Sequence, residues 1–547
     1  MADRRLHPAA LMYAREHEAG LLSRREFLTR ATALGVTAGA AYGLLGLPAP
    51  ALAQAGEPAQ GGTLRMNMET RALKDPRTWD WSEFANFARG WLDYMAEYQR
   101  DGTLRPMLLE SWEANEDATE WTLRVRPGVK WNNGDPFTAE DVVHNIRRWA
   151  DGTVEGNSMA TRFAALQDPA TSQMREDAAE VVDPATVRLR LSQPDITVIV
   201  NMADYPAAVV HQSYDDGDFS AEAIGTGPYL PEEAQVGVRQ VLVRNPDHQW
   251  WGTAVHGGPH LDRIEYIDYG TDAATVVAAA TGGEIDATYQ TTGDYIDIFD
   301  GLGWTRTEAL TASTLAVRFN QLAPEFQDRN VRRALQMAVD NAVVLELGYS
   351  GRGEVAENHH VCPIHPEYAE LPPPVVDPAQ ARQMVVDAGM GDFEFELTSV
   401  DDSWQAATCD AVAAQIRDAG IGIRRTVLPG ATFWNDWLNY PFSATEWAMR
   451  PLGVQVLAVA YRSGEAWNET AFSNREFDEQ LAQALSIADA DRRREVMRRI
   501  EEILQEEGVL IQPYWRALYN HADPRVGGVD VHPALEHHHY KWWISPA

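Results

Sequence analysis

LLESWEANEDATEWTLRVRPGVKWNNGDPFTAEDVVHNIRRW, residues 108–149, is the stretch that decides the fold. In its middle, Trp121, Leu123 and Val125 alternate with polar residues. A period of two is typical of a β-strand that buries one face. The sequence therefore predicts a half-buried strand at this point.

The residues after this strand predict a turn, a second strand and a helix. Pro127-Gly128 reverses the chain, residues 129–131 are a short apolar segment, and residues 132–136 (Asn-Asn-Gly-Asp-Pro) are dense in turn formers. A hairpin follows from this pattern. Thr138 is a helix cap with Asp141 three residues on. The apolar face of the helix consists of Val142, Val143, Ile146 and Trp149.

The order of these residues resembles a known signature. S-W-E followed by W-T-L-R-V-R-P-G-V-K-W-N-N-G-D-P-F-T-A-E-D-V is similar to the fingerprint of the extracytoplasmic solute-binding proteins that serve ABC importers for dipeptides, oligopeptides and nickel complexes. So many turn residues at fixed offsets rarely recur by chance. Residues 225–229 (GTGPY) and the FNQ and DRNVRRALQMAVD motifs after residue 318 match later motifs of the family. The resemblance extends from about Gly61 to the C-terminus.

This resemblance implies an α/β protein with the two-lobed periplasmic-binding-protein fold of type II, in the large cluster that has an extra subdomain in the first lobe. A length of 547 residues agrees, because single cores stop growing near about 250–300 residues. We expect lobe I at residues 56–310 with an inserted subdomain at about 100–190, lobe II at 311–517 and a return to lobe I at 518–547. The two crossings between lobes are the expected hinge.

The N-terminal residues 1–55 predict an export signal. Residues 23–28 (SRREFL) form a twin-arginine pattern, and an apolar run follows at residues 31–47. Cleavage is expected near Ala53 or Ala55. The alternative, a membrane anchor, is disfavoured because the run is shorter than the roughly 20 apolar residues that span a bilayer. We therefore expect Tat export to the periplasm without stable membrane insertion.

The charge balance excludes some partners. The formal net charge is −34, whereas nucleic acids and anionic lipids bind basic surfaces. The chain also has no HExxH, GxSxG, P-loop or CxxC motif. The resemblance implies a binding protein that captures a peptide or similar polar solute and delivers it to ABC permease subunits, and we expect a monomer with no catalytic residue and no cofactor. The alternatives are a nickel-type metal-chelate carrier, an opine or oligosaccharide receptor, and an enzyme on the same scaffold.

The predicted ligand-binding residues are aromatic or cationic. The resemblance places the loop of Trp79 and Trp81, and Trp447 after a strand, at the cleft between the lobes. Arg450 stands near the position where peptide binders of the family carry an acidic residue, so an anionic ligand group is as plausible as an amine. The remaining predicted residues are Trp434, Trp404 and His360.

A cluster of histidine and cysteine residues suggests a metal site as one interpretation. His359, His360, Cys362 and His365 lie within seven residues, but their spacing is irregular, and we favour a rigid loop over a metal site. Cys362 and Cys409 either form a disulfide or remain two buried thiols. Residues 537–539 (HHH) are expected in a terminal strand of lobe I.

Overall fold

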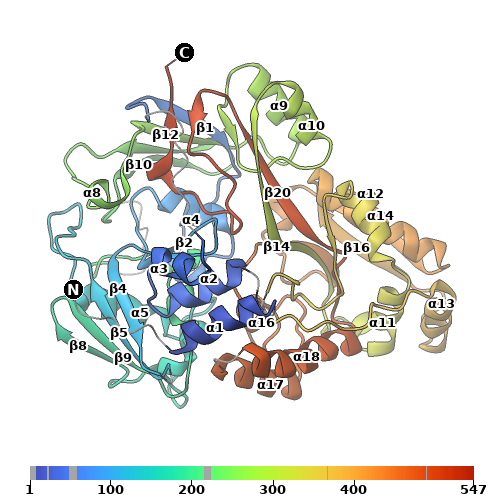
Figure 1. Ribbon diagram of the computed structural model, residues 1–547. Helices are drawn as coiled ribbons and strands as arrows, with labels where there is room; N and C mark the ends of the chain where they lie inside the picture. Colours follow the sequence, from blue (N-terminus) through green and yellow to red (C-terminus); the bar gives the residue numbers. More distant parts are fainter. Residues whose placement is uncertain are drawn as a thin grey trace.

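The computed structural model describes residues 8–20, 22, 24–47, 58–116, 118–214, 223–365, 367–487 and 490–546. One mixed sheet runs through both halves of the described chain (Figure 1). Its strands, in spatial order, are β10 (Tyr229–Gln235), β11 (Arg239–Arg244), β12 (Arg263–Ile267), β1 (Thr63–Asn67), β13 (Ala287–Thr288), β20 (Tyr514–Ala522), β14 (Thr305–Phe319), β18 (Phe442–Trp447), β16 (Glu394–Val400) and β17 (Gly422–Leu428). Two short strands, β15 (Gly353–Val355) and β19 (Leu510–Ile511), pair with β20 and β14.

Two long strands connect the halves of this sheet. We call residues 58–310 and 518–546 lobe I and residues 311–517 lobe II. β14 and β20 pair antiparallel from Thr305 and Ala522 to Leu310 and Ala517, and the register then shifts before Thr314. Figure 1 shows both strands running between the lobes. The register shift lies where the two strands pass from lobe I to lobe II.

The inserted subdomain of lobe I is a separate four-stranded sheet. Its order is β4 (Leu109–Ala114), β5 (Glu120–Val125), β9 (Thr186–Arg190) and β8 (Ala179–Asp183). Trp121, Leu123 and Val125 are buried, as their alternation predicted. The helix α5 (Ala139–Trp149) packs on β8 and β9 and begins with the predicted capping box of Thr138 and Asp141.

The predicted hairpin in this subdomain is wrong in one strand. Residues 129–131 form only an isolated bridge between Lys130 and Pro136. β5 finds its partners in β4 and β9 instead, which already occupy both of its edges. A short apolar segment beside a turn therefore had no free strand edge to join.

The glycines of the GTGPY motif have a structural role. A Cβ atom on Gly225 would lie 1.8 Å from the carbonyl oxygen of Trp91, and one on Gly227 would lie 2.8 Å from that of Gly90. Only glycine allows this close approach of two chain segments.

Helices cover the sheet of lobe II, and several begin at an aspartate. Asp328, Asp340 and Asp402 accept a backbone N–H at the starts of α11, α12 and α14. The helices of lobe II are α11 (Arg329–Met337), α12 (Asn341–Tyr349), α13 (Pro378–Asp387), α14 (Ser403–Asp418), α15 (Gly430–Phe433), α16 (Gly453–Ala460), α17 (Arg475–Ser486) and α18 (Ala490–Glu507). Those of lobe I, besides α5, are α4 (Ser82–Ala88), α6 (Val198–Asn201), α8 (Thr253–His256), α9 (Ala273–Thr281) and α10 (Tyr295–Gly301). Lobe I also contains short strand pairs: β2 (Ala96–Tyr98) with β3 (Leu104–Pro106), β6 (Gln167–Asp168) with β7 (Gln173–Met174), and β21 (Val526–Gly527) with β22 (Trp543–Ile544).

The N-terminal helices α1 (Pro8–Glu18), α2 (Arg24–Ala33) and α3 (Ala38–Leu44) pack on the folded body (Figure 1). Thr32 Oγ1 accepts the backbone N–H of Leu104 at 2.8 Å, and Trp112 Nε1 donates to the carbonyl of Thr32 at 2.9 Å. Among the described helices none is both long and apolar enough to cross a bilayer. The cleavage positions Ala53 and Ala55 lie outside the described residues.

Candidate binding site

A large cavity lies between the two lobes. Its empty volume is about 1360 Å³, which includes space open to solvent. Lobe I contributes the residues after β1, the start of α4, and the segment around β13, whereas lobe II contributes the start of α14 and the end of β18. Five tryptophans of lobe II line the cavity: Trp404, Trp434, Trp437, Trp447 and Trp467.

Aromatic contacts cross the cavity from one lobe to the other. The ring centroid of Trp81 in lobe I lies 4.4 Å from that of Trp434 and 5.3 Å from that of Trp437 in lobe II. Tyr205 of lobe I stacks on Trp467 of lobe II at 5.9 Å. The structure is therefore a closed arrangement of the lobes.

Trp447 lies in the cavity wall, and its contact with a ligand stays a prediction. It ends β18, which pairs with β14, and its indole N–H donates to Glu469 Oε1 at 2.8 Å. Glu469 also accepts from Arg318 and Thr445. This buried network fixes the indole, because each polar atom that orients the ring has a partner.

Arg450 also lines the cavity, but its guanidinium has an anionic partner within the protein. Its Nε lies 3.4 Å from Oδ2 of Asp204 in lobe I, and Asp204 also pairs with Arg162 at 2.8 Å. Burial alone would raise the pKa of Asp204, but Arg162 and Arg450 hold it below its ordinary value. Arg450 is 4% exposed and lies over the rings of Trp447, Trp467 and Tyr205. Its role toward a ligand carboxylate stays a prediction.

The other predicted ligand-binding residues divide into two groups. Trp81, Trp404 and Trp434 line the cavity. Trp79 does not, because its ring is fully buried against Phe84 and its N–H donates to the carbonyl of Lys74.

His360 is buried behind Trp447 rather than in the cavity wall. Its Nδ1 lies 2.7 Å from the hydroxyl of Tyr461, and its ring contacts the indole of Trp447 edge-on at 5.6 Å. Burial lowers its pKa well below the ordinary range. His360 therefore supports Trp447 as a neutral ring and does not reach the cavity.

The four residues of the suggested metal cluster have separate partners. His359 contacts Glu357 at 3.1 Å, and His365 accepts from the backbone of Cys362 and donates to the carbonyl of Arg450. Cys362 and Cys409 are buried free thiols, the second of the two predicted alternatives, and burial raises the pKa of each.

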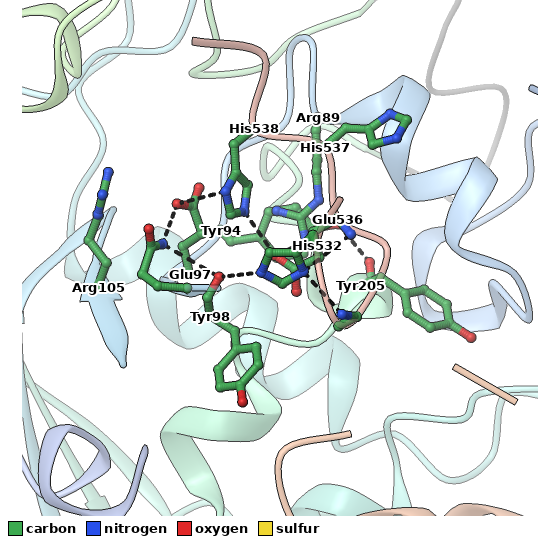
Figure 2. A network of polar contacts seen from close by, with 12 residues as sticks. Arg89, Tyr94, Glu97, Tyr98, Arg105, Tyr205, His532, Glu536, His537 and His538 are labelled. Carbon is green, nitrogen blue, oxygen red and sulfur yellow. Dashed lines mark hydrogen bonds and ion pairs between the residues drawn. The ribbon is translucent and has the colours of Figure 1, made fainter. Parts of the chain in front are cut away.

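In the described part of the chain, the metal-type donors that converge are those of His532, Glu536 and His538. Figure 2 shows them in a hydrogen-bonded network with Arg89 and Glu97. His538 Nε2 lies 3.1 Å from Glu536, which also pairs with Arg89 at 3.2 Å. The other nitrogen of His538 lies 2.9 Å from Lys541 Nζ. Arg89 and Lys541 place two positive charges beside these donors, and the contacts above already occupy their lone pairs. The cluster therefore does not fit a metal site.

The histidines at residues 537–539 are buried, but the expected terminal strand is wrong at this position. His539 begins a 3-10 turn, and the last strand, β22, starts only at Trp543. The hydroxyl of Tyr266 lies 2.8 Å from His537 Nδ1 and 2.6 Å from His539 Nε2. These residues therefore anchor the C-terminal return on lobe I.

The carboxyl groups of the cavity were not among the predicted site residues. Glu69, Asp80, Glu83, Asp402 and Glu446 all line it. Burial raises the pKa of Glu69 to about 7 and that of Asp402 to about 6, and it also raises the pKa of Glu83. In a chain with 80 acidic residues, no local pattern distinguishes these five.

Comparison with known proteins agrees with this architecture. Residues 103–468 match the sequence profile described as bacterial extracellular solute-binding proteins, family 5 Middle. The dipeptide-binding protein DppE of Bacillus subtilis is 22% identical over 489 residues, 83% of this chain and 86% of that protein.

Two solved structures share the fold. The oligopeptide-binding protein AppA of Bacillus subtilis, in complex with a nonapeptide, aligns with a TM-score of 0.78 and 19% identity over 90% of this chain and 100% of that one. AgaA of A. tumefaciens R10, in complex with agropinic acid, aligns with a TM-score of 0.76 and 19% identity over 89% of this chain and 99% of that one.

Proposed function

Because the chain belongs to the bacterial extracellular solute-binding proteins of family 5, we propose that its cleft captures a peptide or a polar solute of similar size. Proteins of this family bind solutes for ABC transporters and are not enzymes. The proposal that the solute is a peptide or of similar size depends on the cavity between the lobes. The walls of this cavity meet through Trp81 and Trp434. A ligand that contacts both walls favours this closed state by its differential affinity.

The closed state is the form that a permease would recognise. β14 and β20 carry the hinge, and the contacts of Arg450 with Asp204 and of Tyr205 with Trp467 form only when the lobes meet. Release follows when the permease favours the open state. No bond of the solute is made or broken in this cycle.

A nickel-type carrier receives less support. Among the described residues that line the cavity, none is histidine or cysteine. A metal would therefore have to arrive in a complex with its own ligands.

The twin-arginine segment at residues 23–28 supports export through the Tat route, with cleavage near Ala53 or Ala55. Tat export moves folded chains, and the mature protein would then act in the periplasm. Cell fractionation with Arg24→Lys and Arg25→Lys together tests the route, because loss of the twin arginines should leave the precursor in the cytoplasm.

Blocking closure sterically tests the proposed function. A Cβ on Gly430 of lobe II would lie 3.4 Å from Thr271 and 3.7 Å from Glu69 of lobe I. Gly430→Leu should therefore hold the lobes apart, whereas Gly301→Leu has open space around its Cβ and is the matched control.

The measurements are native mass spectrometry for retained solute and X-ray scattering with a mixture of peptides and polar solutes. We expect the wild type and Gly301→Leu to bind and contract, and Gly430→Leu to do neither. Binding by Gly430→Leu equal to the wild type, or no binding by any form, would overturn the proposed function.

A further inference from the structure

The charges that line the cleft are not balanced within the protein. Glu446 pairs with Arg516, Asp80 with Lys74 at 2.8 Å, and Arg450 with Asp204. Three carboxyl groups of the cavity wall take no part in these pairs: Glu69, Glu83 and Asp402.

Glu69 and Glu83 in lobe I share one cation. Nη2 of Arg71 lies 3.2 Å from Glu69 and 3.8 Å from Glu83. A single guanidinium neutralises one of these two groups. The lobe I wall therefore carries one carboxyl group in excess.

Asp402 in lobe II caps α14 and accepts the N–H of Trp404 at 3.0 Å. It has no ion-pair partner among the described residues. The charges that act on it most belong to Glu446 and Arg516, which pair with each other. The charge of Asp402 also contributes to the raised pKa of Glu69 in the opposite lobe.

A second observation comes from Gln405, one turn further along α14, whose side chain hydrogen-bonds to Asp402. Its side chain is 2% exposed and lines the cavity, and its Oε1 has no hydrogen-bond partner among the described residues. A buried acceptor without a donor is unfavourable, because it has lost its hydrogen bonds to water. The acceptor requires an N–H or O–H from a molecule in the cavity.

The aromatic walls are suited to a cation. The guanidinium of Arg71 already lies 5.5 Å from the ring centroid of Trp81 and 5.6 Å from that of Trp434. Indole faces attract cations through their quadrupole, most strongly where water is excluded.

We propose that the ligand of this cleft carries an ammonium or guanidinium group that lies between Glu69 and Glu83 of lobe I and Asp402 and Gln405 of lobe II. This inference rests on the proposed function, since it specifies the solute that the cleft captures. Without the cation, carboxyl groups on opposite walls oppose closure. With it, both walls gain a partner, and the N–H donors satisfy Gln405.

The test uses four probes with the purified full-length protein: trilysine, spermidine, and trialanine and triglutamate whose α-amines are acetylated, so that these last two carry no ammonium group. Isothermal titration is run at pH 6.5 in two buffers with different enthalpies of ionisation. A cation lowers the pKa of Glu69 and Asp402, so binding should release protons. We expect trilysine or spermidine to bind at least tenfold more tightly than trialanine and triglutamate. Tighter binding of trilysine indicates a basic peptide, and tighter binding of spermidine indicates a polyamine.

Asp402→Asn is the informative variant, because asparagine also caps a helix and keeps the N–H acceptor of α14. We expect it to weaken binding of the cationic probe at least tenfold and to abolish part of the proton release. Asp328→Asn, at the equivalent cap of α11, is the control and should change neither. Equal melting temperatures of the variants confirm that both fold.

Two results would overturn the inference and are distinguishable. Binding of trialanine or triglutamate in preference to the cations, unaffected by Asp402→Asn, leaves the proposed function intact and excludes the cationic group. Absence of binding and of contraction with all four probes and with the solute mixture removes both proposals.

Discussion

Arg450 of lobe II and Asp204 of lobe I form an ion pair across the cleft, with Nε and Oδ2 3.4 Å apart. Asp204 is held in lobe I by Arg162. The pair is nearly buried, with side-chain exposures of 4% and 13%. It can form only when the lobes approach, so it belongs to the closed state.

The first prediction follows from this pair. Arg450→Leu and Asp204→Asn should each weaken solute binding, because each removes a contact that is made on closure. In a double-mutant cycle the coupling free energy should be about 1–3 kcal/mol. If Arg450 instead binds a ligand carboxylate, Asp204→Asn will leave the affinity unchanged, and only Arg450→Leu will reduce it.

The second prediction concerns the orientation of Trp447. Trp447→Phe removes the N–H that donates to buried Glu469 and leaves that carboxylate oxygen without its partner. We expect the free energy of unfolding in urea to fall by about 1–3 kcal/mol. Trp81→Phe is the control, because the structure records no hydrogen bond from this indole, and it should affect binding more than stability. Equal stability of Trp447→Phe and the wild type would contradict the prediction.

The sequence predicted those parts of the fold that depend on local pattern. The strand at Trp121 and the capping box at Thr138 are both present, because alternation and capping act within a few residues. The strand expected at residues 129–131 did not form, because both edges of β5 are already paired. Local pattern does not show which strand edges are free.

The site could be predicted only in part. Trp81 lines the cavity, whereas Trp79 two residues earlier is buried against Phe84, and the identity of the two residues does not distinguish these positions. The pairing of Arg450 with Asp204 joins residues of different lobes. Such a contact depends on how the lobes close, and no spacing along the chain reveals it.

The third prediction concerns a buried carboxylate beneath the N-terminal helices. Glu367 is fully buried and lies 3.0 Å from Arg493 and 4.0 Å from Arg30 of α2. Glu367→Gln would leave buried guanidinium charge uncompensated, so unfolding free energy should fall by about 3–5 kcal/mol. Urea denaturation of the full chain and of a chain lacking residues 1–55 provides the measurement. We expect the larger loss in the full chain, because Arg30 is present only there, and equal losses would show that Arg30 has no part in the network.

The fourth prediction is a pH dependence of stability in the ligand-free protein. Burial raises the pKa of Glu69 from 4.5 to about 7. Between these values the unfolded chain has lost the proton that the folded protein still holds, so the contribution of Glu69 to the free energy of unfolding falls as the pH rises. Glutamine does not titrate. The stability of the wild type relative to Glu69→Gln should therefore decrease from about pH 4.5 to about pH 7 and be constant above it. Urea titrations of both proteins at half-unit pH steps measure this difference, and a difference that stays constant between about pH 4.5 and about pH 7 would mean that Arg71 keeps Glu69 ionised in the folded protein.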